Sequence, residues 1–130
     1  MGSLLFMRVI VAGSRSITDY NLIKNTLLSY FKSKGLHHQD IEIISGTAKG
    51  VDRLGEQFAE EKHCKLAKFP ADWDRYGKSA GYRRNEQMAE YAKEDNGVLF
   101  AFWDGTSKGT MHMINIAKEK GLIVNIIKVD

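Results

Sequence analysis

Short apolar runs alternate along this chain with longer stretches in which apolar residues recur every three or four positions. Branched and aromatic residues dominate the short runs, which predict buried strands at residues 6–12, 41–45, 65–69, 97–102 and 122–127. The wider spacing predicts amphipathic helices at about residues 19–34, 51–62, 80–93 and 108–120. Strands that alternate with helices favour right-handed crossovers and a parallel sheet. We therefore expect a three-layer α/β fold with a five-stranded, mainly parallel sheet flanked by helices.

The length and composition fit one globular domain. The 130 residues, 43% hydrophobic and 27% charged, suffice for a two-sided core, so we expect a single domain over residues 1–130. Met7 is the expected first residue of the folded unit, with the preceding six residues, or at most residues 1–7, as a short extension. No apolar run approaches the roughly 20 residues needed to cross a bilayer, so no membrane partner is expected.

The start of the chain and its cysteine content bear on location. The first residues lack the charged, apolar and small-residue pattern of a signal peptide. Cys64 is the single cysteine and has no intramolecular partner, so a cytoplasmic location is the simplest expectation. We interpret Cys64 as a small buried hydrophobe rather than a nucleophile.

Loops rich in glycine or basic residues follow four of the predicted strands, at residues 13–16, 45–52, 70–84 and 103–110. The carboxyl ends of parallel strands lie at one edge of a sheet, so the four loops should converge on one crevice. Glycines let backbone N–H groups approach an anion, and the helix after each loop adds a positive dipole end. This pattern predicts a pocket for a phosphorylated, nucleotide-like ligand. The expected binding residues are Gly13, Ser14, Arg15, Ser45, Gly46, Thr47, Lys49, Gly50, Asp52, Trp73, Lys78, Arg83, Arg84, Asn85, Asp104, Gly105, Thr106, Lys108, Gly109 and Thr110.

Two standard nucleotide signatures are absent. The first strand is followed by Gly13 alone, so the G-x-G-x-x-G dinucleotide fingerprint is missing. The Gly77-Lys78-Ser79 segment imitates the tail of a P-loop, but Asp72 stands where the earlier glycine is required. No histidine or cysteine spacing resembles a zinc site. We therefore expect neither a cofactor nor a metal ion.

Single residues in the loops leave alternatives open. The segment from Gly46 to Gly50 is typical of a phosphate-binding loop, but a plain connecting turn has the same composition. Asp52 either complements the dipole of its helix or accepts hydrogen bonds from a ribose or base. Arg83 and Arg84 stand in the first turn of a helix, where a cation costs ~0.3–1 kcal/mol. That placement favours a use in gripping an anion.

Aromatic residues gather in the same loops. Trp73, Tyr76, Tyr82 and Trp103 either stack on a base, worth ~1–3 kcal/mol each, or cover the core. Residues 70–80 are expected to form a long polar loop, and loops of that length are usually functional or mobile.

Four stretches together resemble the SLOG superfamily of Rossmann-like domains. They are VAGSRSITDY, IISGTAKGVD, FPADW with GKSAGYRRNEQM, and FWDGTSKGT, and the resemblance extends over about residues 8–127. Within the superfamily the chain is most similar to small stand-alone proteins related to YspA and YpsA. The resemblance implies a Rossmann-like fold. Because members often pair through helices that flank the sheet, it also implies a homodimer or larger homo-oligomer.

The chain also resembles the Lonely-guy family, similar to proteins named as lysine decarboxylases. Those enzymes hydrolyse the N-glycosidic bond of nucleoside monophosphates. The RNEQM segment at residues 84–88 is similar to their PRKxxM motif, with Asn85 in place of lysine. Residues 104–110 are similar to their PGGxGTxxE motif, but the glutamate central to hydrolysis falls at Met113, which cannot transfer a proton. If catalysis occurs here, Arg84, Glu86 and Asp52 are the candidates.

A third resemblance is to the DNA-processing protein A family, whose Rossmann domain binds single-stranded DNA. Residues 13–15 and 45–52 are similar to its two leading motifs. Three functions are therefore open. The leading one is a module of the sensor or effector kind that binds a nucleotide-like small molecule, and the second is an N-glycosidic hydrolase. Single-stranded DNA binding is less favoured, because a net charge of +3 is low for affinity that rests on many phosphate contacts.

Overall fold

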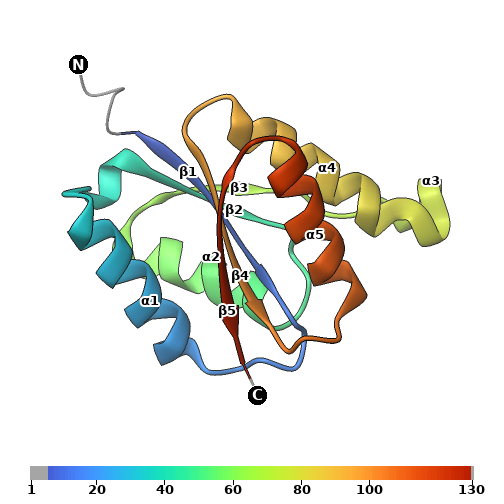
Figure 1. Ribbon diagram of the computed structural model, residues 1–130, viewed down its shortest axis with the longest axis horizontal. Coiled ribbons are helices and arrows are strands. Elements are labelled where there is room, and N and C mark those ends of the chain that lie inside the picture. The colour runs from blue at the N-terminus through green and yellow to red at the C-terminus, as the bar shows by residue number, and fades with distance from the viewer. Residues whose placement is uncertain (1–5, 130) are drawn as a thin grey trace.

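Five short strands of branched and aromatic residues form a parallel sheet between two layers of helices (Figure 1). The computed structural model describes residues 6–129, so most of the predicted N-terminal extension lies outside the described residues. The strands are β1 (Met7–Gly13), β2 (Ile41–Ser45), β3 (Lys65–Lys68), β4 (Gly97–Trp103) and β5 (Ile123–Lys128). The helices are α1 (Tyr20–Ser33), α2 (Val51–Lys62), α3 (Trp73–Tyr76), α4 (Ala80–Lys93) and α5 (Lys108–Glu119). Short 3-10 turns, η2 and η3, occupy His38–Asp40 and Gly77–Ser79.

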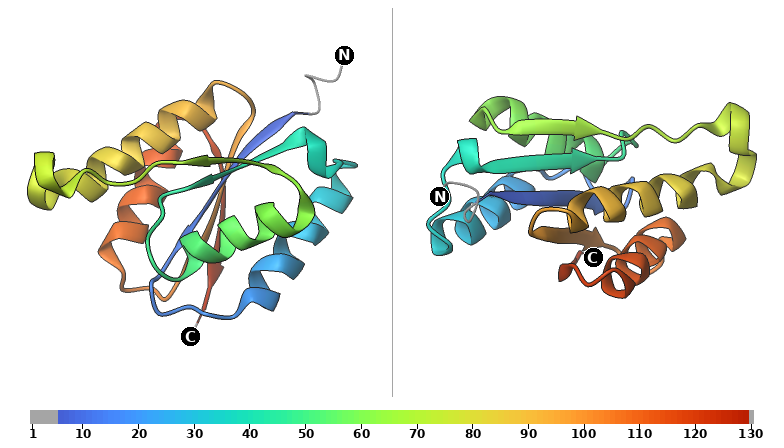
Figure 2. Two further views of the ribbon diagram at one scale, coloured as in Figure 1. Left: turned by 180° about the vertical axis from the view of Figure 1, so that it is seen from behind. Right: turned by 90° about the horizontal axis from the view of Figure 1, so that it is seen from above.

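The strand order β3-β2-β1-β4-β5 places β1 at the centre, with every neighbouring pair parallel. Alternate residues of β1 serve the two faces. Val9 and Val11 belong to the core beneath α1 and α2, whereas Ile10 and Ala12 belong to the core beneath α4 and α5. Figure 2 shows these two helix pairs on opposite sides of the sheet. The predicted three-layer α/β fold is confirmed.

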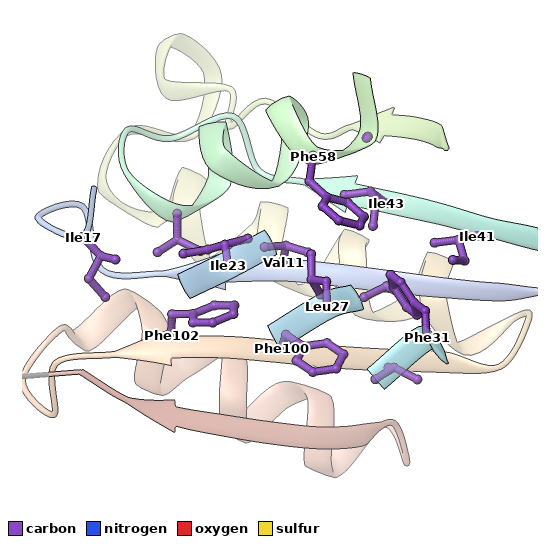
Figure 3. Packing of buried hydrophobic residues seen from close by; sticks show 14 residues of the cluster. Val11, Ile17, Ile23, Leu27, Phe31, Ile41, Ile43, Phe58, Phe100 and Phe102 are labelled. Carbon is purple, nitrogen blue, oxygen red and sulfur yellow. The ribbon is translucent and has the colours of Figure 1, made fainter. Parts of the chain in front are cut away.

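Aromatic side chains fill the core beneath α1 and α2 (Figure 3). Phe31, Phe58 and Phe102 are fully or almost fully buried there, together with Ile23 and Leu27 of α1. Cys64 packs at the edge of this core, and burial raises the pKa of its thiol to about 11. The thiol is therefore neutral at neutral pH, as a packing residue requires.

The segment predicted as a long polar loop is partly helical, which corrects the expectation for residues 70–80. Asp72 caps α3, because its Oδ1 accepts a hydrogen bond from the Arg75 N–H at 3.2 Å. The 3-10 turn η3 then joins α3 to α4. A helix of four residues carries too little periodicity to be recognised in the sequence.

The connections that follow β1 and β4 cross opposite faces of the sheet. These neighbouring strands are followed by α1 and α5, which lie on opposite faces of the sheet. Such a switch leaves an opening outside the carboxyl ends of the two strands, where ligands bind in open α/β sheets. Figure 2 shows α3 projecting past this edge. No helix within residues 6–129 is long and apolar enough to span a membrane.

Candidate functional site

Two adjoining pockets open at the carboxyl edge of the sheet. The first, here the α5 pocket, has a volume of about 260 Å³. It is lined by Ala12, Gly13, Arg15, Ala48, Asp52, Trp73, Lys78, Gly81, Tyr82, Arg84, Asn85, Met88, Ser107, Gly109, Thr110 and Met113. The second, here the α2 pocket, has a volume of about 370 Å³. It is lined by Arg15, Gly46, Thr47, Ala48, Lys49, Arg53, Pro70, Ala71, Trp73 and Arg84. Together they form the cleft discussed below.

Arg84 stands at the junction of the two pockets. One terminal N–H of its guanidinium donates to the carbonyl of Gly46, and its Nε–H donates to Asn85 Oδ1 at 3.1 Å. Burial lowers the pKa of Arg84, while the charge of Asp52 raises it. Within residues 6–129 no carboxylate lies within 4.0 Å of this guanidinium. Arg84 is thus a positioned, partly desolvated cation whose charge is not neutralised by an ion pair.

Asp52 is the single carboxylate among the residues that line the cleft. It lies in the first turn of α2, is 5% exposed, and accepts a hydrogen bond from the Ala48 N–H at 3.1 Å. Burial raises its pKa to about 6, although the Ala48 bond and the charge of Arg84 oppose the rise. Asp52 therefore changes charge near neutral pH inside the cleft.

Asn85 links Arg84 to α5. Its side-chain oxygen accepts from Arg84, and its Nδ2 lies 3.3 Å from the Gly109 carbonyl and 3.1 Å from His112 Nδ1. The His112 ring stacks on Tyr82 with centroids 4.4 Å apart, and burial lowers the pKa of the imidazole. A neutral His112 accepts the Asn85 hydrogen bond through Nδ1. The chain of contacts thus holds Arg84 by its neighbours on α4 and α5.

The loops after β1 and β4 are tied to each other at the bottom of the cleft. The Ser14 N–H donates to the Phe102 carbonyl at 3.0 Å, and the Asp104 N–H donates to Ser14 Oγ at 3.1 Å. A Cβ at Gly13 would overlap the Phe102 carbonyl, so only glycine permits this approach. These bonds fix the two loops relative to each other.

Comparisons with known proteins identify the family. A family model described as YspA, cpYpsA-related SLOG family matches residues 7–76, just over half of the chain. The chain belongs to this SLOG family. The predicted superfamily and its Rossmann-like fold are therefore confirmed.

Two similar proteins add to the picture. The Gene 61 protein of Mycobacterium phage D29 is 29% identical over 124 residues, covering 90% of this chain and 93% of that protein. The X-ray structure of DNA processing protein A from Streptococcus pneumoniae matches with a TM-score of 0.72 at 18% identity. That match covers 98% of the SLOG chain but only 52% of the other, so this chain spans about half of that protein. At this identity the structural likeness establishes the fold alone.

The structure brings many of the predicted binding residues of the SLOG protein to the cleft and leaves others outside. Those lining the α5 pocket are Gly13, Arg15, Asp52, Trp73, Lys78, Arg84, Asn85, Gly109 and Thr110. Those lining the α2 pocket only are Gly46, Thr47 and Lys49. Those lining neither are Ser14, Ser45, Gly50, Arg83, Asp104, Gly105, Thr106 and Lys108.

Arg83 and the catalytic candidate Glu86 lie on another face of α4, where both line a separate hollow. Arg83 stacks over the Tyr76 ring at 4.4 Å, and its Nε–H donates to Ser79 Oγ at 3.1 Å. In the structure Arg84 lines the cleft, whereas Arg83 lines only the separate hollow. The expectation that both arginines grip one anion is therefore corrected.

Several predicted residues serve the loops themselves. Asp104 Oδ1 accepts from the N–H groups of Thr106 and Ser107, both at 2.8 Å, and these bonds lower the pKa of Asp104. Ser45 is fully buried and donates to Glu56 at 2.6 Å. These side chains shape the loops and do not line the cleft.

Sequence reasoning missed some lining residues. Gly81, Arg84, Asn85 and Met88 share one face of α4 at helical spacing, and only two of them were predicted. The three- and four-residue spacing of these positions could have identified them as one face of the helix. Met113, which stands at the position of the Lonely-guy glutamate, is 1% exposed and lines the α5 pocket. Within residues 6–129 no three histidine, cysteine or carboxylate side chains gather as metal ligands would.

The raised pKa of Asp52 predicts a specific pH dependence of stability. Its folded-state pKa of about 6 lies above the ordinary value of 3.8, so the folded state holds the proton more tightly than the unfolded state. The free energy of unfolding should therefore fall by about 2–3 kcal/mol as the pH rises from about 4 to about 6. Replacing Asp52 by asparagine should remove this fall, as urea titrations at a series of pH values would show.

Asp104, whose pKa is shifted in the opposite direction from that of Asp52, provides the control for that prediction. Backbone hydrogen bonds lower the pKa of Asp104, so its contribution is present above the ordinary pKa and is lost as pH falls. Asp104→Asn should therefore be destabilised relative to wild type only at the higher pH values. If the free energy of unfolding of Asp52→Asn varied with pH as it does in wild type, the raised pKa of Asp52 would not be the source of the pH dependence.

Proposed function

We propose that the cleft binds a nucleotide-like ligand through its phosphate, and that the protein is a binding module of the sensor or effector kind. The observation that carries this proposal is the state of Arg84. Its guanidinium is held by the Gly46 carbonyl and by Asn85, and the charge of Asp52 acts on it without a direct ion pair. A partly buried charge is costly without a partner, and a phosphate oxygen supplies a strong, directional one.

The surroundings of Arg84 support a nucleotide rather than a bare anion. Trp73 and Tyr82 line the α5 pocket and are 52% and 45% exposed, so their rings are available for stacking on a base. The first turn of α5 enters the same pocket through Gly109 and Thr110. No atom lies within 4 Å of a Cβ built on Gly109, which leaves room for a ligand to approach the backbone.

The arrangement favours binding over hydrolysis. Enzymes that cleave glycosidic bonds generally use two carboxyl groups, one acid and one base or nucleophile. Here Asp52 is the single carboxylate that lines the cleft, because Glu86 faces another side of α4 and Asp104 is engaged in its own loop. Release of free base from nucleoside monophosphates, followed by chromatography, would replace the binding proposal with an enzymatic one.

The test is a thermal-shift and calorimetric comparison of the four ribonucleoside 5′-monophosphates with their nucleosides. A ligand at about 100 times its Kd adds ~2.7 kcal/mol to the folded state, which is readily measured. We expect at least one nucleotide to raise the melting temperature while its nucleoside does not. Equal shifts for nucleoside and nucleotide would contradict a phosphate-centred site, and no shift with any of them would contradict the proposal.

Single-stranded nucleic acid is the second candidate, favoured by the structural likeness to DNA processing protein A. A short oligonucleotide tests it directly. Affinity that falls steeply with salt, and that mononucleotides do not compete away, would favour this function. Our proposal expects a mononucleotide to compete. The homo-oligomer and the cytoplasmic location stay predictions.

A further inference from the structure

The two pockets of the cleft share one wall. Arg15, Ala48, Trp73 and Arg84 line both of them, so the two pockets meet along a boundary that carries two cations. A ligand confined to the α5 pocket would occupy about 260 Å³, below the roughly 300–1,000 Å³ typical of small-molecule sites. The adjoining α2 pocket adds about 370 Å³ on the other side of this wall. A ligand that fills the cleft therefore passes the two shared arginines.

Charge is divided unequally between the two pockets. The α2 pocket is lined by four basic side chains and no carboxylate; the basic residues are Arg15, Lys49, Arg53 and Arg84. Arg53 is held toward the loop before α2, because its Nε–H donates to the Thr47 carbonyl at 3.0 Å. The α5 pocket is also lined by three basic residues, Arg15, Lys78 and Arg84, but it alone contains a carboxylate, the buried Asp52, together with the exposed ring of Tyr82. The α2 end of the cleft thus suits a second negative group better, and the α5 end suits a polar and aromatic group beside Asp52.

Asp52 fixes the direction of the ligand. A carboxylate repels a phosphate and accepts hydrogen bonds from hydroxyl or amino groups. The nucleoside part therefore fits the α5 pocket beside Asp52, and the phosphates fit the junction and the α2 pocket. A single phosphate at Arg84 would leave the charges of Lys49 and Arg53 unused.

Resting on the function proposed above, we infer that the ligand is a nucleotide with a 5′-diphosphate group, and that this group crosses from Arg84 at the junction into the α2 pocket. Its first phosphate contacts Arg84 and Arg15. Its second phosphate, or a group attached to it, lies against Lys49 and Arg53. The nucleoside occupies the α5 pocket, with its base near Tyr82 or Trp73.

The experiment compares four matched pairs of probes by isothermal titration calorimetry: AMP with ADP, GMP with GDP, CMP with CDP and UMP with UDP. The variants are the Lys49→Ala, Arg53→Ala double variant and, as a control, the Lys32→Ala, Lys118→Ala double variant. The control removes the same charge from the last turns of α1 and α5, at the opposite edge of the sheet. Circular dichroism melting of all proteins checks that each is folded.

We expect at least one diphosphate to bind wild type about 10- to 100-fold more tightly than its monophosphate, since each charge-assisted contact adds affinity. This preference for the diphosphate should vanish in the Lys49/Arg53 variant and persist in the control. Equal affinity for both members of every pair would overturn the inference while the proposed function stands. A preference that persists in the Lys49/Arg53 variant would overturn the placement of the second phosphate. Absence of binding by all eight probes would overturn both proposals.

Discussion

Replacing Arg84 by alanine should weaken nucleotide binding by about 10- to 100-fold, because a hydrogen bond to a charged group contributes ~1.5–3 kcal/mol. The loss should appear with a monophosphate as well as with a diphosphate, since Arg84 lies at the junction of both pockets. The fold should survive, because the guanidinium is bound by one carbonyl and one side-chain amide at the surface of the sheet edge. Calorimetry with the nucleotide that gives the largest thermal shift measures the effect.

Arg83 is the matched control, since it is the neighbouring residue and carries the same charge. Its side chain stacks over Tyr76 and bonds Ser79, outside the two pockets. Arg83→Ala should change nucleotide affinity by less than about twofold, within the range of surface electrostatics. Arg84→Lys should bind with intermediate affinity, because lysine keeps the charge but lacks the planar guanidinium fork. Equal losses for the two alanine variants would mean that net charge, and not the position of Arg84, governs binding.

The contrast between these two arginines shows what the sequence of α4 could and could not predict. Both were expected at the anion because both stand in the first turn of a helix, where a cation is unfavourable. The buried residues of α4 distinguish them, since Asn85, Met88 and Ala92 set the rotation of the helix about its axis. Arg84 lies four residues before Met88, on the side that faces the cleft. The hydrogen bond from Arg84 to Gly46 joins residues 38 positions apart, which no local pattern reveals.

The fold was easier to predict from the sequence than the site, because hydrophobic periodicity and composition are local features of the chain. The expected bounds of β2, α2 and α4 agree with the structure, since each is bounded by a glycine, a cap or a sharp change of polarity. The segment 70–80 was misread because α3 depends on a single cap, Asp72, and has no buried residue. Likewise, the roles of Asp104 and Ser45 within their own loops depend on hydrogen bonds that only the folded backbone creates.

Gly50→Ala should destabilise the protein by more than about 3 kcal/mol, because backbone strain alone costs ~1–3 kcal/mol and a steric clash adds to it. Gly50 has φ 79° and ψ −129°, a combination that side chains disfavour strongly. An added Cβ would also stand 2.6 Å from the Arg15 carbonyl oxygen and 2.7 Å from that of Ser14. A loss of this size lowers the melting temperature by roughly 10 °C. Urea unfolding and calorimetric melting both measure it.

Gly35→Ala is the control for this prediction, because it introduces backbone strain without a steric clash. It also has a positive φ, of 68°, but no atom lies within 4 Å of a Cβ built there. Gly35→Ala should therefore cost only about 1 kcal/mol, the strain of a left-handed alanine. If Gly50→Ala costs no more than Gly35→Ala, the loop after β1 yields to the new Cβ, and the two loops are not held together at this point. If it costs much more, the loop after β1 and the loop before α2 are packed too tightly at Gly50 to accommodate a Cβ beside the Ser14 and Arg15 carbonyls. The backbone of Arg15, a residue that lines both pockets, then lies against a glycine that lines neither.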